Sequence, residues 1–228
     1  MCCADLDRKV ERVLVALDIT AAVVDEAIAG GYDVVLSHHP LIFHPLHAVT
    51  PTNGVAKKVI RLMEAGITAM SYHTRLDAVA GGVNDALAEA FGLHDVVPFG
   101  EGGEAIGRIG TLETAVSLDE FAGRVKAVTG APSVQVADAG RAVYRVALLG
   151  GGGSGDVMAA FAAGADTYLT GELKHNQLTD APELGMNLIA AGHFYTEDHI
   201  CKRLCELVLE FDPTVEVHIT NSNAVRIV

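Results

Sequence analysis

The chain has 228 residues, enough for one large domain or two small lobes, and half of them are hydrophobic, as in a packed globular protein rather than a disordered one. The net charge of −13 argues against a nucleic-acid surface, which needs clustered Lys and Arg. No apolar run approaches the length of a membrane span, and the first residues lack the apolar stretch of a secretory signal. We therefore expect a cytoplasmic protein that binds neither nucleic acid nor membrane.

The four cysteines support the same compartment. Cys2 and Cys3 are adjacent, and Cys201 and Cys205 have the i, i+4 spacing of a helix, so no obvious partners exist for disulfides. Reduced thiols are the expectation, and a cysteine zinc site is the weaker alternative because zinc knuckles use shorter spacings.

The first half of the chain alternates predicted strands and helices. Short apolar, β-branched runs predict strands at 12–17, 33–36 and 67–72. Helical periodicity, with glycine at each end point, predicts helices at 21–29, 53–65 and 82–91. Such alternation requires crossover connections and predicts a mainly parallel sheet in an α/β protein.

The second half begins after a polar, glycine-rich segment at Pro98–Gly103, which is a plausible lobe boundary. Ser117 to Glu120 form a capping-box sequence that opens a helix ending at Val128. An amphipathic helix is expected over 196–211, and another ends at Ala163. Strands are predicted at 134–137, 143–149, 167–170, 187–191 and 215–219.

Histidines follow the ends of three predicted strands. His38 and His39 follow the second strand and precede Pro40, His73 follows the third, and His193 follows the strand at 187–191. Ligands and metals bind beyond the carboxyl ends of strands in open α/β sheets, so we expect a metal site there. Adjacent histidines on an extended chain point in opposite directions, so either a turn at Pro40 aims both inward or each serves a different metal.

Carboxylates accompany two of these histidines, with Asp77 four residues after His73 and Glu197 four residues after His193. Imidazoles and carboxylates together suit Zn, Mn, Fe, Co or Ni better than Ca or Mg. Five or six donors exceed the three that a mononuclear catalytic zinc site uses, which favours two divalent ions. A mononuclear site and no metal at all are the alternatives.

A glycine run, Gly150–Gly155, lies between a predicted strand and a helix. It fits a G-x-G-x-x-G pattern with Glu172 at the distance of a ribose-binding acid, but any such run matches easily. We interpret it as a tight turn, with substrate-phosphate contact or dinucleotide binding as alternatives. Beyond the next strand, Glu172 and His175 are candidates for an acid/base pair or for groups that support metal ligands, with a solvated loop as the alternative.

These motifs resemble the type 2 GTP cyclohydrolase I family, which includes the Nif-three-like proteins. The matching pieces are Ser37–Leu41, His73–Leu87, Thr170–His175 and Gly192–Glu197, in the family's order. The resemblance implies a two-lobed fold of parallel and mixed sheets flanked by helices, with a dinuclear metal site at strand ends between the lobes. Its metal ligands fall on His38, His39, Asp77, His193 and Glu197. It also implies a homohexameric ring.

In this resemblance His73 stands beside the site rather than among the ligands. The expected lobes are 1–98 with 188–228, which bind the metal, and 99–187. Some ninety residues between Asp95 and Gly185 leave no room for the domain inserted in longer members. Relatives usually have a helix and a Trp-Asp-Asn-type segment before the first strand, and Arg75 stands where they often carry a small or amide side chain.

The implied activity is metal-assisted hydrolysis of a nucleotide-like small molecule, with attack on the guanine ring of GTP. Arg75 and Lys174 are candidate contacts to the substrate phosphates. A metal-dependent phosphoesterase would use the same parts. Two further classes of protein fit these residues less closely: a non-enzymatic metal-binding interaction protein and a dinucleotide-dependent oxidoreductase.

Overall fold

A computed structural model describes residue 1 and residues 7–100 and 105–227 of the chain. Cys2, Cys3 and half of the expected boundary at Pro98–Gly103 lie outside these residues. The chain divides into two compact units, the first formed by Met1–Leu76 with Ile200–Arg226 and the second mainly by Asp77–His199. No helix among the described residues is long and apolar enough to cross a lipid bilayer.

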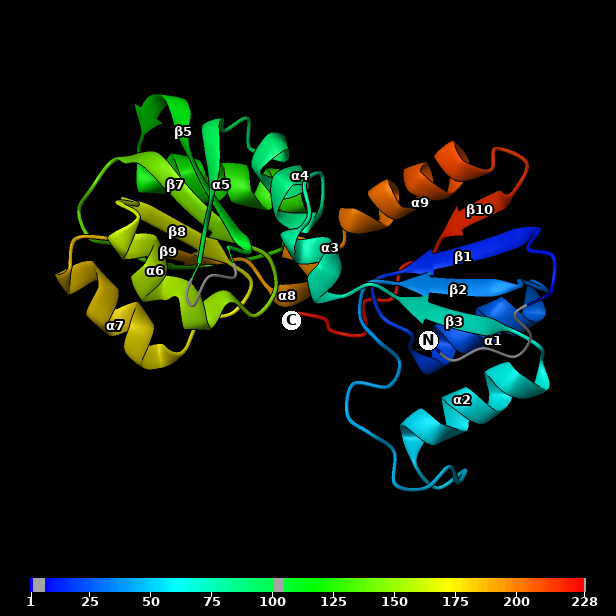
Figure 1. Ribbon diagram of the computed structural model, residues 1–228. Helices are drawn as coiled ribbons and strands as arrows, with labels where there is room; N and C mark the ends of the chain where they lie inside the picture. The colour runs from blue at the N-terminus through cyan, green and yellow to red at the C-terminus, as the bar shows by residue number, and fades with distance from the viewer. Residues whose placement is uncertain (2–6, 101–104, 228) are drawn as a thin grey trace. The chain divides into compact units, whose positions relative to one another are not determined.

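The first unit contains a four-stranded parallel sheet in the order β10-β1-β2-β3 (Figure 1). Its strands are β1 (Arg12–Ala16), β2 (Val34–Ser37), β3 (Thr68–Ser71) and β10 (Glu216–Ile219). Helices α1 (Ala21–Ala29) and α2 (Gly54–Glu64) cover one face, and α9 (Ile200–Phe211) packs on the other against β1 and β10. This arrangement fits the burial of parallel strands on both faces.

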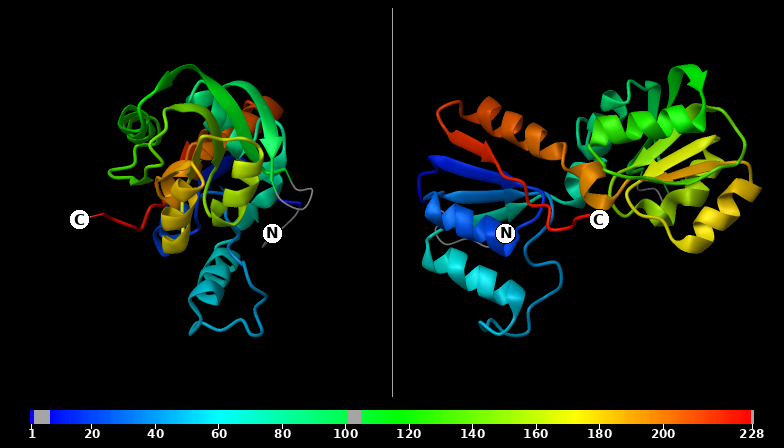
Figure 2. Two further views of the ribbon diagram at one scale, coloured as in Figure 1. Left: turned by 90° about the vertical axis from the view of Figure 1, so that its left-hand side faces the viewer. Right: turned by 180° about the vertical axis from the view of Figure 1, so that it is seen from behind.

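The second unit contains a six-stranded mixed sheet in the order β4-β5-β7-β8-β9-β6. The strands β7, β8 and β9 run parallel, whereas β4, β5 and β6 pair antiparallel with their neighbours. Helices lie on both faces of this sheet, as the view from behind in Figure 2 also shows. The strands are β4 (His94–Phe99), β5 (Gly107–Val116), β6 (Gln135–Ala137), β7 (Val143–Leu149), β8 (Thr167–Thr170) and β9 (Asn187–Ala190).

Two hydrophobic clusters hold the second sheet between its helices. Helices α4 (Val83–Ala90) and α5 (Leu118–Thr129) cover one face of the sheet. Phe91, the C-cap of α4, and Phe121 of α5 pack over the centre of this face, and both are fully buried. On the other face, Tyr168 lies under α6 (Val157–Ala162) and α7 (His175–Glu183). All three aromatic side chains are fully buried, so they contribute a large share of the apolar contact between this sheet and its helices.

Local signals account for the helices that the sequence predicted. Thr20, Asn53 and Ser117 each accept a hydrogen bond from the first turn of the helix that follows, and these N-caps begin α1, α2 and α5. Gly130 ends α5 in the left-handed conformation, with φ of 73°, which glycine adopts without strain. The predicted parallel and mixed α/β architecture is therefore confirmed.

The boundary between the units differs from the expected one. The chain passes from one unit to the other after Leu76 and after His199, whereas the sequence suggested 98 and 187. The reason is strand pairing: β9 pairs with β8 and β6 in the second sheet, and α4 packs on β5 and β7. The strands that end before His38, His73 and His193 therefore belong to two separate sheets, although all three strand ends looked equivalent in the sequence.

Several elements were not predicted. The edge strand β4 is exposed along most of its length and contains Pro98, and β5 contains Gly107, against which the ring of Phe99 packs, so neither has a clear apolar pattern. Short α3 (Thr74–Ala78) and α7 were also missed. The helix expected over 196–211 is two helices, α8 (His193–Glu197) and α9, interrupted at Asp198 and His199.

Candidate metal centre

Three histidines of the first unit form a group that could bind a metal ion. One nitrogen from each of His38, His39 and His73 lies within 4.8 Å of the other two. Their ring centroids are 4.9 to 5.6 Å apart, and His38 is fully buried. Neutral imidazole is a good ligand for Zn and for the first-row transition ions, so this donor set fits such an ion.

The backbone explains how adjacent histidines come to face one space. The His38 and His39 amides donate to the carbonyls of Ala16 and Leu17, which continue the pairing with β1 beyond the end of β2. The His73 amide donates to the His38 carbonyl at 3.0 Å. His73 itself has a φ of 38°, an uncommon conformation for a residue with a side chain. This turn ends β3 and places the His73 ring beside His38 and His39.

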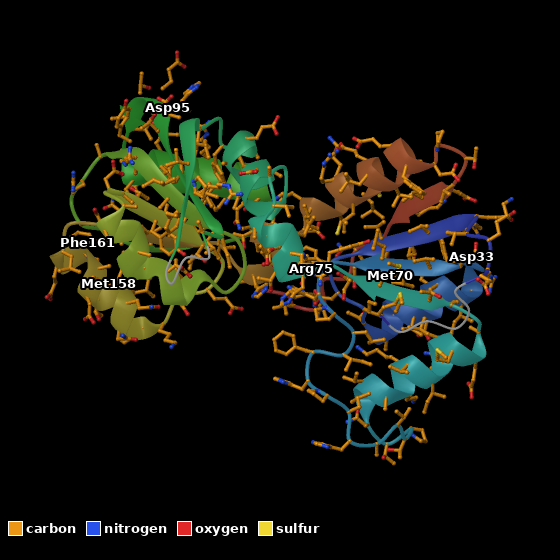
Figure 3. The ribbon with its side chains drawn as sticks, in the orientation of Figure 1. Asp33, Met70, Arg75, Asp95, Met158 and Phe161 are labelled. Carbon is orange, nitrogen blue, oxygen red and sulfur yellow. The ribbon has the colours of Figure 1, made fainter. Side chains whose placement is uncertain are left out.

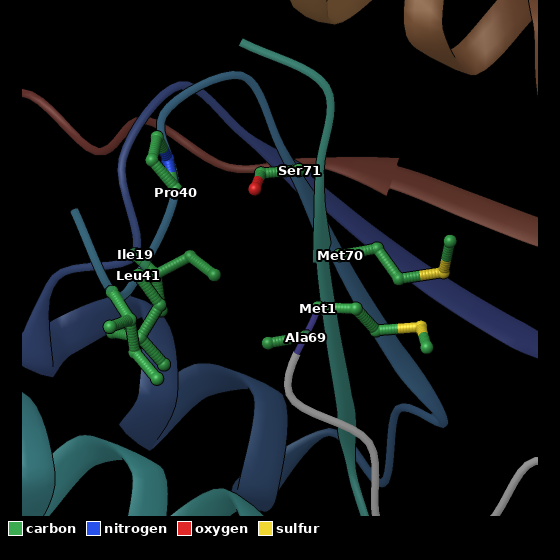
Figure 4. Close-up of a pocket in the computed structure, with 8 residues that line it drawn as sticks. Met1, Ile19, Pro40, Leu41, Ala69, Met70 and Ser71 are labelled. Carbon is green, nitrogen blue, oxygen red and sulfur yellow. The ribbon is translucent and has the colours of Figure 1, made fainter. Parts of the chain in front are cut away.

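The turn after His39 packs against the same sheet. Pro40 and Leu41 lie on one side of a small pocket, and Ala69 and Ser71 of β3 lie on the other (Figure 4). The pocket has a volume of about 40 Å³, room for only one or two water molecules. It is therefore part of the support for the histidine turn and has no room for a substrate.

A carboxylate that the sequence analysis did not single out orients one of these rings. Asp18 Oδ1 lies 2.8 Å from His39 Nδ1. Such a contact holds the proton on Nδ1 and leaves Nε2 with a lone pair, the usual arrangement of a metal-binding histidine. Asp18 directly follows the first predicted strand, so the same rule of strand ends that selected the histidines could have found it.

The second unit brings together the other predicted donors. His193 and Glu197 lie one turn apart on α8, with Nε2 and Oε2 3.1 Å apart, and Glu197 is only 5% exposed. A carboxylate oxygen of Asp77 lies within 4.8 Å of one of Glu197. Two neighbouring carboxylates, one of them buried, repel each other unless a cation compensates their charge.

Glu172 contacts the same histidine from the loop after β8. Its Oε1 lies 3.3 Å from His193 Nδ1, on the opposite side of the ring from Glu197. Glu172 therefore contacts Nδ1 of His193 in the same way that Asp18 contacts Nδ1 of His39. The structure therefore places this sequence candidate in contact with His193.

The remaining sequence candidates stand apart from these groups. Lys174 and His175 are exposed at the start of α7, and within the described part of the chain neither makes a hydrogen bond or ion pair with His193 or Glu197. Arg75 is exposed on the first turn of α3 (Figure 3). An exposed cation of this kind is available to an anionic substrate.

The glycine run lies directly against α8. The amides of Gly150, Gly151 and Gly153 donate to the side chains of Asn84, Thr196 and Thr170, respectively. These amides are therefore engaged within the protein and unavailable to the phosphates of a dinucleotide. The run acts as a tight turn held by Asn84 and Thr196. Both residues lie in segments that carry the family resemblance, but no local pattern marked either of them individually.

The fold and these groups define a class: an α/β protein of two units, with clustered histidines and carboxylates that could bind a metal ion. Comparison with known proteins gives the family. The family model Duf34/NIF3 (NGG1p interacting factor 3) matches residues 1–225. The chain belongs to the Duf34/NIF3 family.

Relatives and solved structures agree with this assignment. The chain is 37% identical to a "GTP cyclohydrolase 1 type 2 homolog" of Nostoc sp., over 86% of this chain and 76% of the relative. It is 31% identical to a protein of the same description from Clostridium perfringens, over 93% and 83%. The crystal structure of Staphylococcus aureus protein SA1388 superposes with a TM-score of 0.87 at 26% identity, covering 99% of this chain and 90% of that one.

Proposed function

We propose that this protein is a dinuclear divalent-metal hydrolase that acts on a nucleotide-like substrate. The ligands of its two ions, Zn, Mn, Fe, Co or Ni, are His38, His39, Asp77, His193 and Glu197. The observation that carries the proposal is the pair of donor groups, one in each unit. Each group mixes buried and accessible donors of the kinds these metals prefer.

The paired carboxylates support the ligand assignment further. His39 and His193 both have Nδ1 beside a carboxylate, that of Asp18 or Glu172, at 2.8 and 3.3 Å. Outer carboxylates of this kind raise the basicity of a ligating imidazole and fix its tautomer. We therefore propose that Nε2 of both rings binds metal.

Bound ions would lower the pKa of water and polarise the substrate, which is the chemistry of a metal-dependent hydrolase. The chain's own residues have the tasks of orientation and charge. His73 lies beside His38, with the ring centroids 5.6 Å apart, and Arg75 and Lys174 are available to neutralise substrate phosphates. Glu172 is placed to hold His193, and His175, near the start of the same loop–helix segment, is the candidate to exchange a proton with substrate or leaving group.

The relatives' description points to guanine ring opening as the reaction, and the same ligands would serve a phosphoesterase. We also propose a homohexamer in the cytoplasm.

The test combines metal analysis with activity. The purified chain is loaded with Zn²⁺ or Mn²⁺, its metal content is measured by elemental analysis, and its molar mass is measured by light scattering. It is then incubated with GTP and with phosphomonoester and phosphodiester substrates, while guanine absorbance and inorganic phosphate are followed. About two ions per chain with turnover of one substrate class supports the proposal. A fully metallated protein that hydrolyses none of them is a metal-binding interaction protein instead.

A further inference from the structure

Two buried polar side chains meet the glycine run at consecutive amides. The Gly150 N–H donates to Asn84 Oδ1 at 2.8 Å, and the Gly151 N–H donates to Thr196 Oγ1 at 2.9 Å. Asn84 is 1% exposed and Thr196 is fully buried. Buried polar groups are retained at such positions when each of their hydrogen bonds has a defined partner.

The far side of Asn84 reaches the segment that carries Asp77. Its Nδ2 donates to the Asp77 carbonyl at 3.3 Å and to the Ile106 carbonyl at 3.1 Å. Both amide hydrogens and the amide oxygen are thus used, which fixes the orientation of the side chain. Asn84 therefore connects the backbone of a proposed metal ligand to Gly150.

The far side of Thr196 reaches the other ligands. Thr196 lies on α8 between His193 and Glu197, and its hydroxyl is within hydrogen-bond distance of the carbonyls of Gly192 and His193, at 3.1 and 3.0 Å. Its single proton can serve one of these carbonyls while its oxygen accepts from Gly151. Thr196 therefore fixes α8 on the same turn to which Asn84 fixes Asp77.

We infer that Asn84 and Thr196 are positioning residues that set the distance between Asp77 and the ligands of α8 through the adjacent amides of Gly150 and Gly151. The inference rests on the proposed function, because it takes Asp77, His193 and Glu197 as metal ligands. Consecutive Cα atoms are about 3.8 Å apart, so the two anchor points are held at one short, covalently fixed separation. The carboxylates of Asp77 and Glu197, about 120 positions apart in the chain, are thereby kept within 4.8 Å of each other.

A purely structural role would predict a different result, and Thr170 provides the matched control. Thr170 is also fully buried and also accepts from an amide of the run, that of Gly153 at 3.1 Å. It lies on β8, and its hydroxyl also donates to the Gly151 carbonyl at 3.3 Å. Among the described residues, no hydrogen bond of this hydroxyl reaches a segment that carries a proposed ligand, whereas the Thr196 hydroxyl lies within hydrogen-bond distance of the His193 carbonyl. Thr170→Val and Thr196→Val therefore remove the same kind of bond from the same turn.

The experiment measures the Zn²⁺ affinity of the full chain by competition with a chromophoric chelator, the absorption spectrum of the Co²⁺-loaded chain, and urea unfolding of the metal-free chain. Thr196→Val should bind Zn²⁺ about 10- to 100-fold more weakly, the usual effect of losing a group that orients metal ligands, and should change the Co²⁺ spectrum. Thr196→Ser, which keeps the hydroxyl, should restore both. Thr170→Val should lose stability but retain the wild-type affinity and spectrum.

Asn84→Asp keeps the shape of the side chain but replaces its two donors, so it should also weaken Zn²⁺ binding, and it carries the test if Thr196→Val fails to fold. Wild-type affinity in folded Thr196→Val or Asn84→Asp overturns the inference while the proposed function stands. Equal loss of affinity in Thr170→Val also overturns it. A wild-type chain that binds no Zn²⁺ refutes the proposed function together with the inference.

Discussion

A methyl group added at Gly151 should abolish most metal binding while the chain still folds. Its φ of +65° lies in the left-handed region, where a residue with a Cβ loses about 1–2 kcal/mol. A Cβ there would also lie 2.7 Å from Glu197 Cδ and 2.9 Å from His193 Nε2, closer than real Cβ atoms approach other atoms. Glu197 and His193 would have to move, because the turn is held by its own hydrogen bonds.

We therefore expect Gly151→Ala to lower the free energy of unfolding by about 1–2 kcal/mol and to lose most of its bound metal. The neighbouring Gly152 is the control. Its φ is −86°, and the nearest atom to an added Cβ is His193 Cε1 at 4.0 Å, an ordinary contact. Gly152→Ala should retain the metal content of the wild type.

The assay is elemental analysis of both variants after loading and gel filtration, with urea unfolding of the metal-free and metal-loaded chains. Bound metal should raise the unfolding free energy of the wild type and Gly152→Ala but add little to Gly151→Ala, because a ligand stabilises only the state that binds it. Gly151→Ala with full metal content would refute the assignment of His193 and Glu197. Metal loss in Gly152→Ala would show that the contacts of the turn extend further than this geometry indicates.

His39→Ala and Glu197→Ala should each lower the bound metal measured by elemental analysis, and unchanged stoichiometry in both would disprove the ligand set. Asp18→Ala should weaken Zn²⁺ binding about 10- to 100-fold while saturating concentrations restore full occupancy, because Asp18 only orients His39. Occupancy that saturation cannot restore would make Asp18 a ligand. A hydrogen bond from Arg12, with a further one from His218, lowers the pKa of Glu216 from 4.5 to about 2 in the folded chain. Its stabilising contribution is therefore complete above pH 4.5 and is lost as the pH falls toward 2. Glu216→Gln should reduce the slope of stability against pH in this interval, as measured by urea unfolding, and an unchanged slope would contradict this contribution.

Sequence reasoning located the helices and strands whose signals are local. Asn53 caps α2 and Ser117 caps α5 through hydrogen bonds within one turn, and the buried strands β1 and β2 are short apolar runs. It missed β4 because an exposed edge strand gains its stability from one neighbour rather than from its own composition. It also joined α8 and α9, because amphipathic spacing continues across the interruption.

Some features of the candidate site could likewise be predicted from the sequence, and others could not. Histidines after strand ends and carboxylates four residues further along are visible in the order of residues, since period and position in a βα unit depend on neighbours in the chain. Which sheet each strand joined, and therefore that β9 belongs to a different sheet from β2 and β3, depended on pairing between distant segments.

The amino-acid sequence by itself determined the residue types of the site and the strand ends at which they occur, because those follow from local backbone preferences. The tertiary structure alone decided that Asp18 faces His39, that Glu172 faces His193, and that the glycine turn is held by buried side chains. These contacts join residues up to 66 positions apart. Their geometry exists only once two sheets and their helices have packed, which no local pattern encodes.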